Sequence, residues 1–539
     1  MDADSIPLNE MTGAIVPVSR DITNRHHEGY QWETRFGSDN TRFSRDEYRA
    51  FLDVIRSCCG DDDGGPVDEI IAFMMPYPSS TSWERCVSNT EDFCEHGSFA
   101  LQHFIQADQR DPRLGVAQEP RAWVLDNSPS SQDAASPTLN RALTNIELKE
   151  ALQLHRFNEN ATDNVAAYTR RVYISNPNGA SILALMRALP PLQVDGFRKL
   201  LSGYLTTALV PSLMLIDSDW WGSANFVIAF NLPFFAISTA ECQDHRKFGA
   251  NKDLRARYLI NSLHLEVPGE ESQENVNSSH NLVLQEAVFS FVISGRSDNY
   301  WTAICLNDDS FDEYPRIDDD DITDVPTDPI IMKPDMGNPD LMWSPRSYAL
   351  LALASQLEKI IEYHKDVQFH LSISLDHYGS MIKHGVITGD ANRRLQAWRR
   401  EFPEALGRVI NFNTGLALQL SNFILEDLQV GQDEAFHGIL WQSLQGDICA
   451  LRSLRKIKSL HTQLRAIGVH FEHLKVAYES VKIESESQLE DAWRDHLRRE
   501  DTDTETNNAQ PNEDQNNYNT VLRIAIAGFV GQPIQPNFI

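Results

Sequence analysis

The C-terminal third of the chain carries the most regular pattern of apolar and polar positions. Apolar residues recur there at alternating intervals of three and four, which is the spacing of one face of a helix. Ser344 and Pro345 precede this run, as a helix N-cap and a first-turn proline would. The seam has one polar member, for which we expect a register-fixing or solvent-edge role rather than metal binding. Its members are Leu350, Leu353, Leu357, Ile360, His364, Val367 and Leu371.

Two further helical stretches follow this seam. The first runs from Asn392 to Gln429, is interrupted at Pro403 and has Gly431 where a C-terminal cap would fall. The next is predicted from about Asp433 to Arg499 and would reach roughly 100 Å. A helix of that length must pack along the preceding helices, along copies of itself, or both. Its apolar stripe comprises Leu464, Ile467, Phe471, Leu474, Tyr478 and Val481.

Strand and helix patterns alternate upstream, between about Thr169 and Asp324. "RRVYIS" predicts a strand, and two helices are expected after it, one through Leu185 and one over Gln193 to Leu205. The apolar runs "LMLID", "NFVIAFNLPFFAIS", "AVFSFVISG" and "YWTAICLND" predict further strands, and Pro233 indicates an edge or a bulge. The fold class expected is therefore an α/β (or α+β) sheet domain followed by a long-helix antiparallel bundle or coiled-coil stalk.

Two uncharged runs, Leu200 to Ile216 and Trp220 to Ala240, leave a second interpretation open. Together they have the length of a helical hairpin in a bilayer. Pro211, Asn225 and Asn231 are costly at membrane depth, and β-branched and aromatic residues favour strands, so we expect a buried strand pair. The apolar run near the C-terminus, Thr520 to Val530, is too short for a helical bilayer crossing.

These patterns divide the chain into five segments. Residues 1–165 form a poorly defined, partly disordered region with short helices, and 166–324 form the sheet domain with acidic loops. A proline-rich linker over 325–343 leads into the long-helix bundle of 344–500. Residues 501–539 form a polar, acidic tail with a short apolar end.

Composition narrows the possible functions. The formal net charge of −30 argues against binding to a nucleic-acid backbone, and it favours cation attraction or simply solubility. Seven cysteines show no zinc-site spacing, which indicates free thiols in a reducing compartment. The start "MDADSIPLNE" has no secretory pattern. We expect a cytoplasmic protein, associated with a membrane only through a partner or if its C-terminus is incomplete.

Candidate chemistry is sparse. No phosphate loop, nucleophile elbow or kinase signature is present, so we expect no enzyme. His470 and His473 lie three apart but lack a third ligand, which favours a surface pair. Carboxylates crowd the run "DDSFDEYPRIDDDDITD" and offer either a weak site for a hard cation such as Mg²⁺ or a solvated acidic loop. The candidate ligands are Asp308, Asp309, Asp312, Asp318, Asp319, Asp320 and Asp321.

Several segments, in order, resemble the fungal CorA-like proteins, a branch of the CorA magnesium-transporter superfamily. They are "RRVYISNPNGASILALMRALPPLQVDGFRKLLSGYL", "FVIAFNLPFFAIS", "LQEAVFSFVISGRSDNYWTAICLND" and "WSPRSYALLALASQLEKIIEYH". The resemblance covers roughly residues 170–499. It implies a cytosolic α/β domain with a helical stalk, pentamer assembly, divalent ions that regulate gating, and two membrane helices with a Gly-Met-Asn loop.

The chain departs from that pattern at its C-terminal end. Neither paired apolar spans nor a Gly-Met-Asn sequence follows the last helix, so it looks like a soluble descendant or an incomplete gene model. Two functions stay open. One is a cytosolic module, related to divalent-cation (Mg²⁺) transporters, regulatory or truncated, without its own pore. The other is a soluble coiled-coil interaction or scaffold protein with no specific metal function. Partners expected are further copies of the chain or full-length CorA-like relatives, bound through the stalk, and no nucleic acid.

Overall fold

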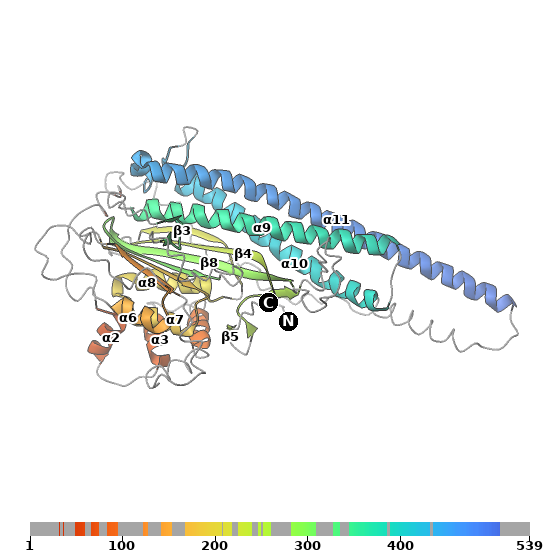
Figure 1. Ribbon diagram of the computed structural model, residues 1–539, viewed down its shortest axis with the longest axis horizontal. Coiled ribbons are helices and arrows are strands. Elements are labelled where there is room, and N and C mark those ends of the chain that lie inside the picture. Colours follow the sequence, from red (N-terminus) through yellow and green to blue (C-terminus); the bar gives the residue numbers. More distant parts are fainter. Residues whose placement is uncertain are drawn as a thin grey trace, which may run out of the picture.

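A computed structural model gives the three-dimensional arrangement of the chain (Figure 1). In the part that it describes, a β-sheet lies between a layer of short helices and a layer of three long helices. The described residues are 32, 36, 49–59, 66–74, 84–94, 122–127, 142–153, 168–206, 208–217, 225–239, 246–248, 252–259, 282–308, 327–331, 333–334, 344–384, 389–431 and 435–506.

The sheet has seven strands in the order β1-β2-β9-β8-β4-β3, with β7 paired to β8 beyond the end of β9. β2 and β9 are parallel, and the other neighbours are antiparallel. Each predicted strand is present, and the sheet domain with long C-terminal helices confirms the expected fold class. The strands are β1 (Ala122–Asn127), β2 (Tyr168–Ser175), β3 (Ser212–Asp217), β4 (Phe226–Thr239), β7 (Arg257–Leu259), β8 (Leu282–Ser297) and β9 (Tyr300–Asn307). Two-residue strands pair as β5 (Lys247–Phe248) with β6 (Lys252–Asp253), and β10 (Thr327–Asp328) with β11 (Lys333–Pro334).

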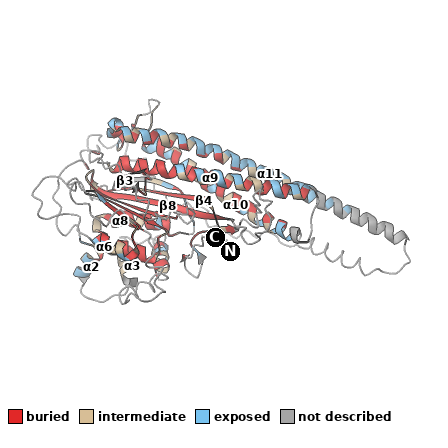
Figure 2. Ribbon diagram, in the orientation of Figure 1, coloured by how far each residue is buried: buried red, intermediate tan, exposed pale blue. Residues whose placement is uncertain are grey.

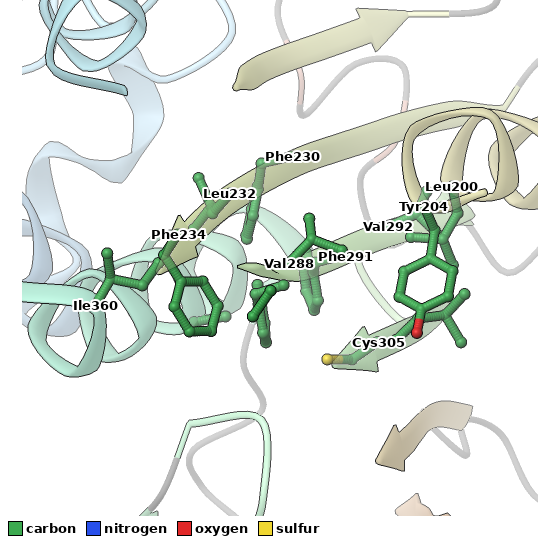
Figure 3. Packing of buried hydrophobic residues seen from close by; sticks show 14 of the residues in the cluster. Leu200, Tyr204, Phe230, Leu232, Phe234, Val288, Phe291, Val292, Cys305 and Ile360 are labelled. Atoms are coloured by element: carbon green, nitrogen blue, oxygen red, sulfur yellow. The ribbon is translucent and has the colours of Figure 1, made fainter. Parts of the chain in front are cut away.

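Apolar side chains fill both faces of the central β4–β8 pair. Phe230 and Phe291 are register partners and stack with ring centroids 4.6 Å apart, on the face that also contacts Tyr348 of a long helix. On the opposite face, Gly196 lets a short helix approach Val292, because an added Cβ would come within 3.2 Å. Figure 3 shows this core from close by. Burial on both faces explains why the strands read as nearly continuous apolar runs.

The uncharged stretch over residues 200–240 contributes β3 and β4, so the strand-pair interpretation is confirmed and the membrane hairpin is wrong. Among the residues that the structure describes, none of the helices combines the length and the apolar content needed to cross a bilayer. The expected edge position of Pro233 is also found. β3 ends at the Ser212–Asn231 pair, so Pro233 lies where β4 keeps only β8 as a neighbour, and its missing N–H costs no ladder bond.

Short helices from the N-terminal half cover the other face. Their local sequence sets their ends: Thr144 and Glu147 form a reciprocal capping box, and the Asn178 side chain caps the next helix by accepting from Ser181 N at 3.0 Å. Part of the first 165 residues belongs to this core, since Phe73, Cys94 and Leu148 are fully buried. The helices are α2 (Phe51–Cys59), α3 (Pro66–Met74), one over residues 84–94, α6 (Asn145–Gln153), α7 (Gly179–Ala188) and α8 (Pro191–Tyr204).

The three long helices are α9 (Pro345–His384), α10 (Gly389–Asn422) and α11 (Ile448–Thr506). α9 and α11 run in the same direction and α10 runs against both (Figure 1). The predicted seam of α9 is buried throughout, and Ser344 caps this helix through Ser347 N. The predicted interruption at Pro403 is wrong, because α10 continues through it. Pro403 cannot donate to Arg399 O, and that carbonyl accepts instead from the Tyr478 hydroxyl of α11 at 3.1 Å.

The start of the last helix also differs from the prediction. α11 begins at Ile448 rather than near Asp433, because the Asp447 carboxylate accepts from Cys449 N and Ala450 N and caps it. Between α10 and α11 the chain makes a π turn (Phe423–Asp427) and a 3₁₀ turn (Gln442–Gly446). Gln429, with φ 46°, takes the left-handed position that we had expected at Gly431.

The proline-rich segment is not a free linker where the structure describes it. Asp328, Ile330 and Ile331 are buried, and Gln356 of α9 donates to Ile330 O at 2.8 Å. The prolines predict a lack of regular structure, but they do not prevent two isoleucines from packing into the core.

Candidate functional site

Asp308, the first of the candidate cation ligands, follows the end of β9 and is fully buried. Its Oδ2 accepts from Arg255 Nε at 2.6 Å and from Val288 N at 3.0 Å. Its Oδ1 accepts from Arg246 Nη1 at 2.8 Å and from the Tyr204 hydroxyl at 2.5 Å. Both oxygens are therefore engaged by donors from α8, β8 and the segment that precedes β7.

The electrostatics of this cluster follow from its depth. Burial acts to raise the pKa of Asp308, but the charges of Arg255 and Arg246 outweigh it and hold the pKa below its ordinary value. Burial raises the pKa of Tyr204 well above its usual range, so this hydroxyl stays a donor. The Arg255 guanidinium also lies 4.8 Å from the Tyr204 ring centroid.

This geometry is that of an internal anion shared by two arginines. A divalent cation at Asp308 would face two positive charges with one carboxylate, so the described contacts favour a structural role for this residue. The remaining candidates, Asp309, Asp312 and Asp318 to Asp321, lie outside the described residues. Ion binding by those six carboxylates stays a prediction.

A second charged cluster joins the sheet to α10. Glu286 of β8 accepts from Arg408 Nη2 at 2.9 Å and from Ala256 N at 2.9 Å. Arg408 also donates to the Tyr258 hydroxyl at 3.1 Å. Burial is the largest influence on Glu286 and raises its pKa, although Arg408 opposes the shift. The cluster is a clamp between β8 and α10.

A third cluster lies under the N-terminus of α9. Arg171 of β2 donates to Asp328 at 2.6 Å, and the Tyr348 hydroxyl donates to the same oxygen at 2.9 Å. Both Arg171 and Asp328 are buried. This ion pair fixes the β10 segment between the sheet and the first turn of α9.

The polar member of the α9 seam is the centre of a contact among all three long helices. His364 Nδ1 lies 3.2 Å from Asn413 Oδ1, and Asn413 Nδ2 donates to Leu464 O at 3.1 Å. Gly468 leaves the space, since a Cβ there would lie 2.6 Å from Asn413 Nδ2. This placement supports the register-fixing role and excludes the solvent edge, because His364 is fully buried.

Within the described part of the chain, no group of three or more His, Cys, Asp or Glu side chains is placed to hold a metal ion. His470 and His473 are both exposed, with ring centroids 6.3 Å apart, as expected for a surface pair. A cavity of about 10 Å³ between the sheet, α9 and the π turn has a wholly apolar lining that includes Phe230, Leu353 and Trp441. It is too small for an organic substrate.

The surface of α11 is the remaining feature with functional potential. Its inner stripe packs on α9 and α10, whereas Val469, Val476 and Ile483 are 55%, 66% and 65% exposed. Figure 2 shows exposed residues along the side of α11 that faces away from α9. α11 also projects past the ends of α9 and α10 (Figure 1).

Sequence reasoning missed the arginine partners of the buried acids. Arg255 and Asp308 lie 53 residues apart, and Arg171 and Asp328 lie 157 apart. One available signal was the arginine pair Arg170-Arg171, which directly precedes the buried run Val172 to Ile174, since charges inside a buried strand require buried partners.

No known family model matches the chain, and no curated protein matches it. Among solved structures it is similar to the full-length CmaX protein, at 9% identity over 77% of this chain and 88% of that one, with a TM-score of 0.34. It is also similar to the ZntB cytoplasmic domain from Vibrio parahaemolyticus RIMD 2210633, at 12% identity over 61% of this chain and 96% of that one, with a TM-score of 0.26. At these scores the likeness is partial, and the fold described above rests on the chain's own elements.

Proposed function

We propose that the chain is a CorA-like module of a divalent-cation transport system, which regulates transport and does not catalyse a reaction. The observation that carries the proposal is the layout of the chain, in which a mixed sheet leads through Ser344 and Pro345 into three long helices. The segments that resemble the CorA-like proteins form β2, α7, α8, β4, β8, β9 and α9 in that order. A cytoplasmic location fits this role.

The cation is part of the proposal. Mg²⁺ binds to the acidic run after β9 through oxygen ligands from Asp309, Asp312 and Asp318 to Asp321. Asp308 then anchors the start of that run to the sheet through Arg255 and Arg246. Because Asp308 connects the acidic run to the sheet, ion binding at the run would change the stability of the folded state.

Thermal unfolding of the intact chain during a Mg²⁺ titration tests the cation. A ligand present at 100 times its dissociation constant stabilises the folded state by about 2.7 kcal/mol, so the melting temperature should rise with the logarithm of the Mg²⁺ concentration above the dissociation constant. Sodium chloride at matched ionic strength controls for screening. The control variant replaces Asp318, Asp319, Asp320 and Asp321 by Asn and should lose the response. A flat titration of the wild-type chain would remove specific Mg²⁺ sensing.

Assembly through the long helices is the second part of the proposal. The partners are further copies of this chain or full-length CorA-like relatives, and the exposed length of α11 offers the contact surface. No nucleic-acid partner is proposed, because the net charge is −30.

A second candidate function is a soluble coiled-coil scaffold that binds no metal specifically. The observation that favours it is the pairing of Asp308 with two arginines, which leaves the described part of the acidic run without a cation ligand. The Mg²⁺ titration separates the two candidates.

A further inference from the structure

Charge is segregated along α11. Residues 448–471 contain five lysines and arginines and no aspartate or glutamate, although the whole chain has a net charge of −30. Residues 472–506 contain eleven acids and five bases. One helix therefore carries a basic half and an acidic half.

The outer face of α11 carries a row of exposed apolar residues that runs from the basic half into the acidic half. Val469, Val476 and Ile483 recur every seven residues and lie opposite the stripe that packs on α9 and α10, because seven residues complete about two turns. Arg465 and Glu486 lie on the exposed surface beside them. Seven-residue spacing of apolar positions with charged neighbours is the pattern of a helix that pairs with another helix.

The C-terminal end of α11 extends past α9 and α10, the two helices on which it packs. Gly379 of α9 contacts Val481, and α9 ends five residues later, at His384. Arg399 of α10 accepts from the Tyr478 hydroxyl, and α10 begins ten residues earlier, at Gly389. About 20 residues of α11, roughly 30 Å, therefore extend past the described ends of α9 and α10, as Figure 1 shows. Most of this acidic projection has no helix beside it in the described structure.

We propose that two copies of the chain pair antiparallel through the outer faces of α11, with the acidic half of each on the basic half of the other. If Val469 of one copy faces Val476 of its partner, Arg455 falls opposite Glu490, and Lys458 falls beside Glu486. Residues 487–497 of each projection then lie along residues 448–458 of the other α11, which contain no acid. A parallel pair would instead place five bases against five bases, which is repulsive.

The pair is closed and two-fold symmetric, because the same face serves in both copies, and it therefore differs from the pentamer that the resemblance implies. Charge indicates which partner binds the outer face of α11. The surplus negative charge of the chain opposes nucleic acid and anionic membranes. A second α11 instead supplies an acidic half for the basic half and a basic half for the acidic half. This inference rests on the assembly part of the proposed function and is independent of Mg²⁺.

Cross-linking of the wild-type chain tests the orientation. An equal mixture of unlabelled and ¹⁵N-labelled protein is treated with a zero-length carbodiimide reagent, and peptides of mixed isotope composition report contacts between copies. We expect links from Lys458 to Glu486 or Glu490. A parallel pair has no carboxylate near Lys458 and would instead link Lys482 to Glu479 or Glu484. Mixed-isotope links of this second kind, without the first, would overturn the proposal.

Charge exchange tests the complementarity. Lys458→Glu with Arg465→Glu, and separately Glu479→Lys with Glu486→Lys, should each weaken self-association at least tenfold by light scattering. An equimolar mixture of the two variants should restore the pair. The matched control, Lys365→Glu with Lys383→Glu on the exposed side of α9, should leave the mass unchanged, and far-ultraviolet circular dichroism verifies folding.

The outcomes are separable from those of the proposed function. A failure of the mixture to restore the pair, or unchanged association of both variants, would overturn the antiparallel arrangement alone. A wild-type chain that is monomeric at all concentrations would overturn the arrangement together with the proposed assembly. Neither result bears on the Mg²⁺ titration.

Discussion

At the scale of single residues, Asn413 shows how one polar side chain specifies a packing arrangement. It contacts His364 of α9 and donates to Leu464 O of α11, so one amide connects three helices. An apolar residue at position 413 would pack between the helices without fixing how they align along their axes. Buried polar pairs of this kind specify register more than they add stability.

Gly468 is expected to be required by this contact. Gly468→Ala places a Cβ 2.6 Å from Asn413 Nδ2, so Asn413 must move and its bond to Leu464 O is strained. Gly407→Ala is the matched control, because a Cβ at that helical position meets nothing within 4 Å. In denaturant unfolding, Gly407→Ala should stabilise by about 0.5–1 kcal/mol, and Gly468→Ala should destabilise. Equal gains at both positions would contradict the contact.

The pH dependence of stability should report on His364. Burial lowers its pKa to about 4 from an ordinary 6.5, although the bond to Asn413 opposes the shift. The folded state therefore favours the neutral ring, and this contribution is complete above pH 6.5 and is lost as the pH falls towards 4. Full loss amounts to about 3 kcal/mol. The free energy of unfolding of His364→Leu, measured from pH 8 to 4, should lack this component of the slope.

Asp308 should be important for stability even without a metal. Asp308→Asn keeps the shape of the side chain but leaves the Arg255 and Arg246 charges without a buried counterion, which costs about 3–5 kcal/mol. Thermal or denaturant unfolding measures the loss. A change below about 1 kcal/mol would show that the cluster is not held together by this charge.

At the scale of elements, the regular patterns were predictable and the irregular ones were not. The α9 seam has apolar periodicity over many residues, and β4, β8 and β9 are nearly continuous apolar runs, so the existence of these elements follows from local sequence. The late start of α11 depends on one cap at Asp447, and α10 continues through Pro403 where the Tyr478 hydroxyl, 79 residues away, donates to Arg399 O. The burial of Asp328 depends on Arg171, which is remote in sequence. Contacts between residues that are far apart in the chain leave little trace in the sequence around either residue.

The clamp between Glu286 and Arg408 should fix α10 to the sheet. Its energy is measured with Glu286→Gln, Arg408→Met and the double variant, because the cycle isolates the pair. We expect a coupling of about 1–3 kcal/mol, since the carboxylate is buried and the guanidinium is partly exposed. Additive losses would mean that α10 is held by apolar contacts such as Phe412 on Phe235 alone.

At the scale of the whole molecule, the sheet is covered on both faces while α11 keeps a long exposed side. The polar clusters in the described part of the fold pair side chains from different elements, so they hold these elements together. The surface that we propose for assembly is the outer face of α11, which combines apolar positions every seven residues with charge of both signs. The sequence predicted a long helix and its possible self-association, but the face left free became visible only with α9 and α10 in place.

The molar mass of the intact chain, measured by light scattering over a range of concentrations at low salt, tests assembly through α11 most directly. We expect a mass that rises with concentration from 61.1 kDa towards twice that value and falls again as salt screens the charged halves. A mass that stays at 61.1 kDa under all these conditions would contradict it.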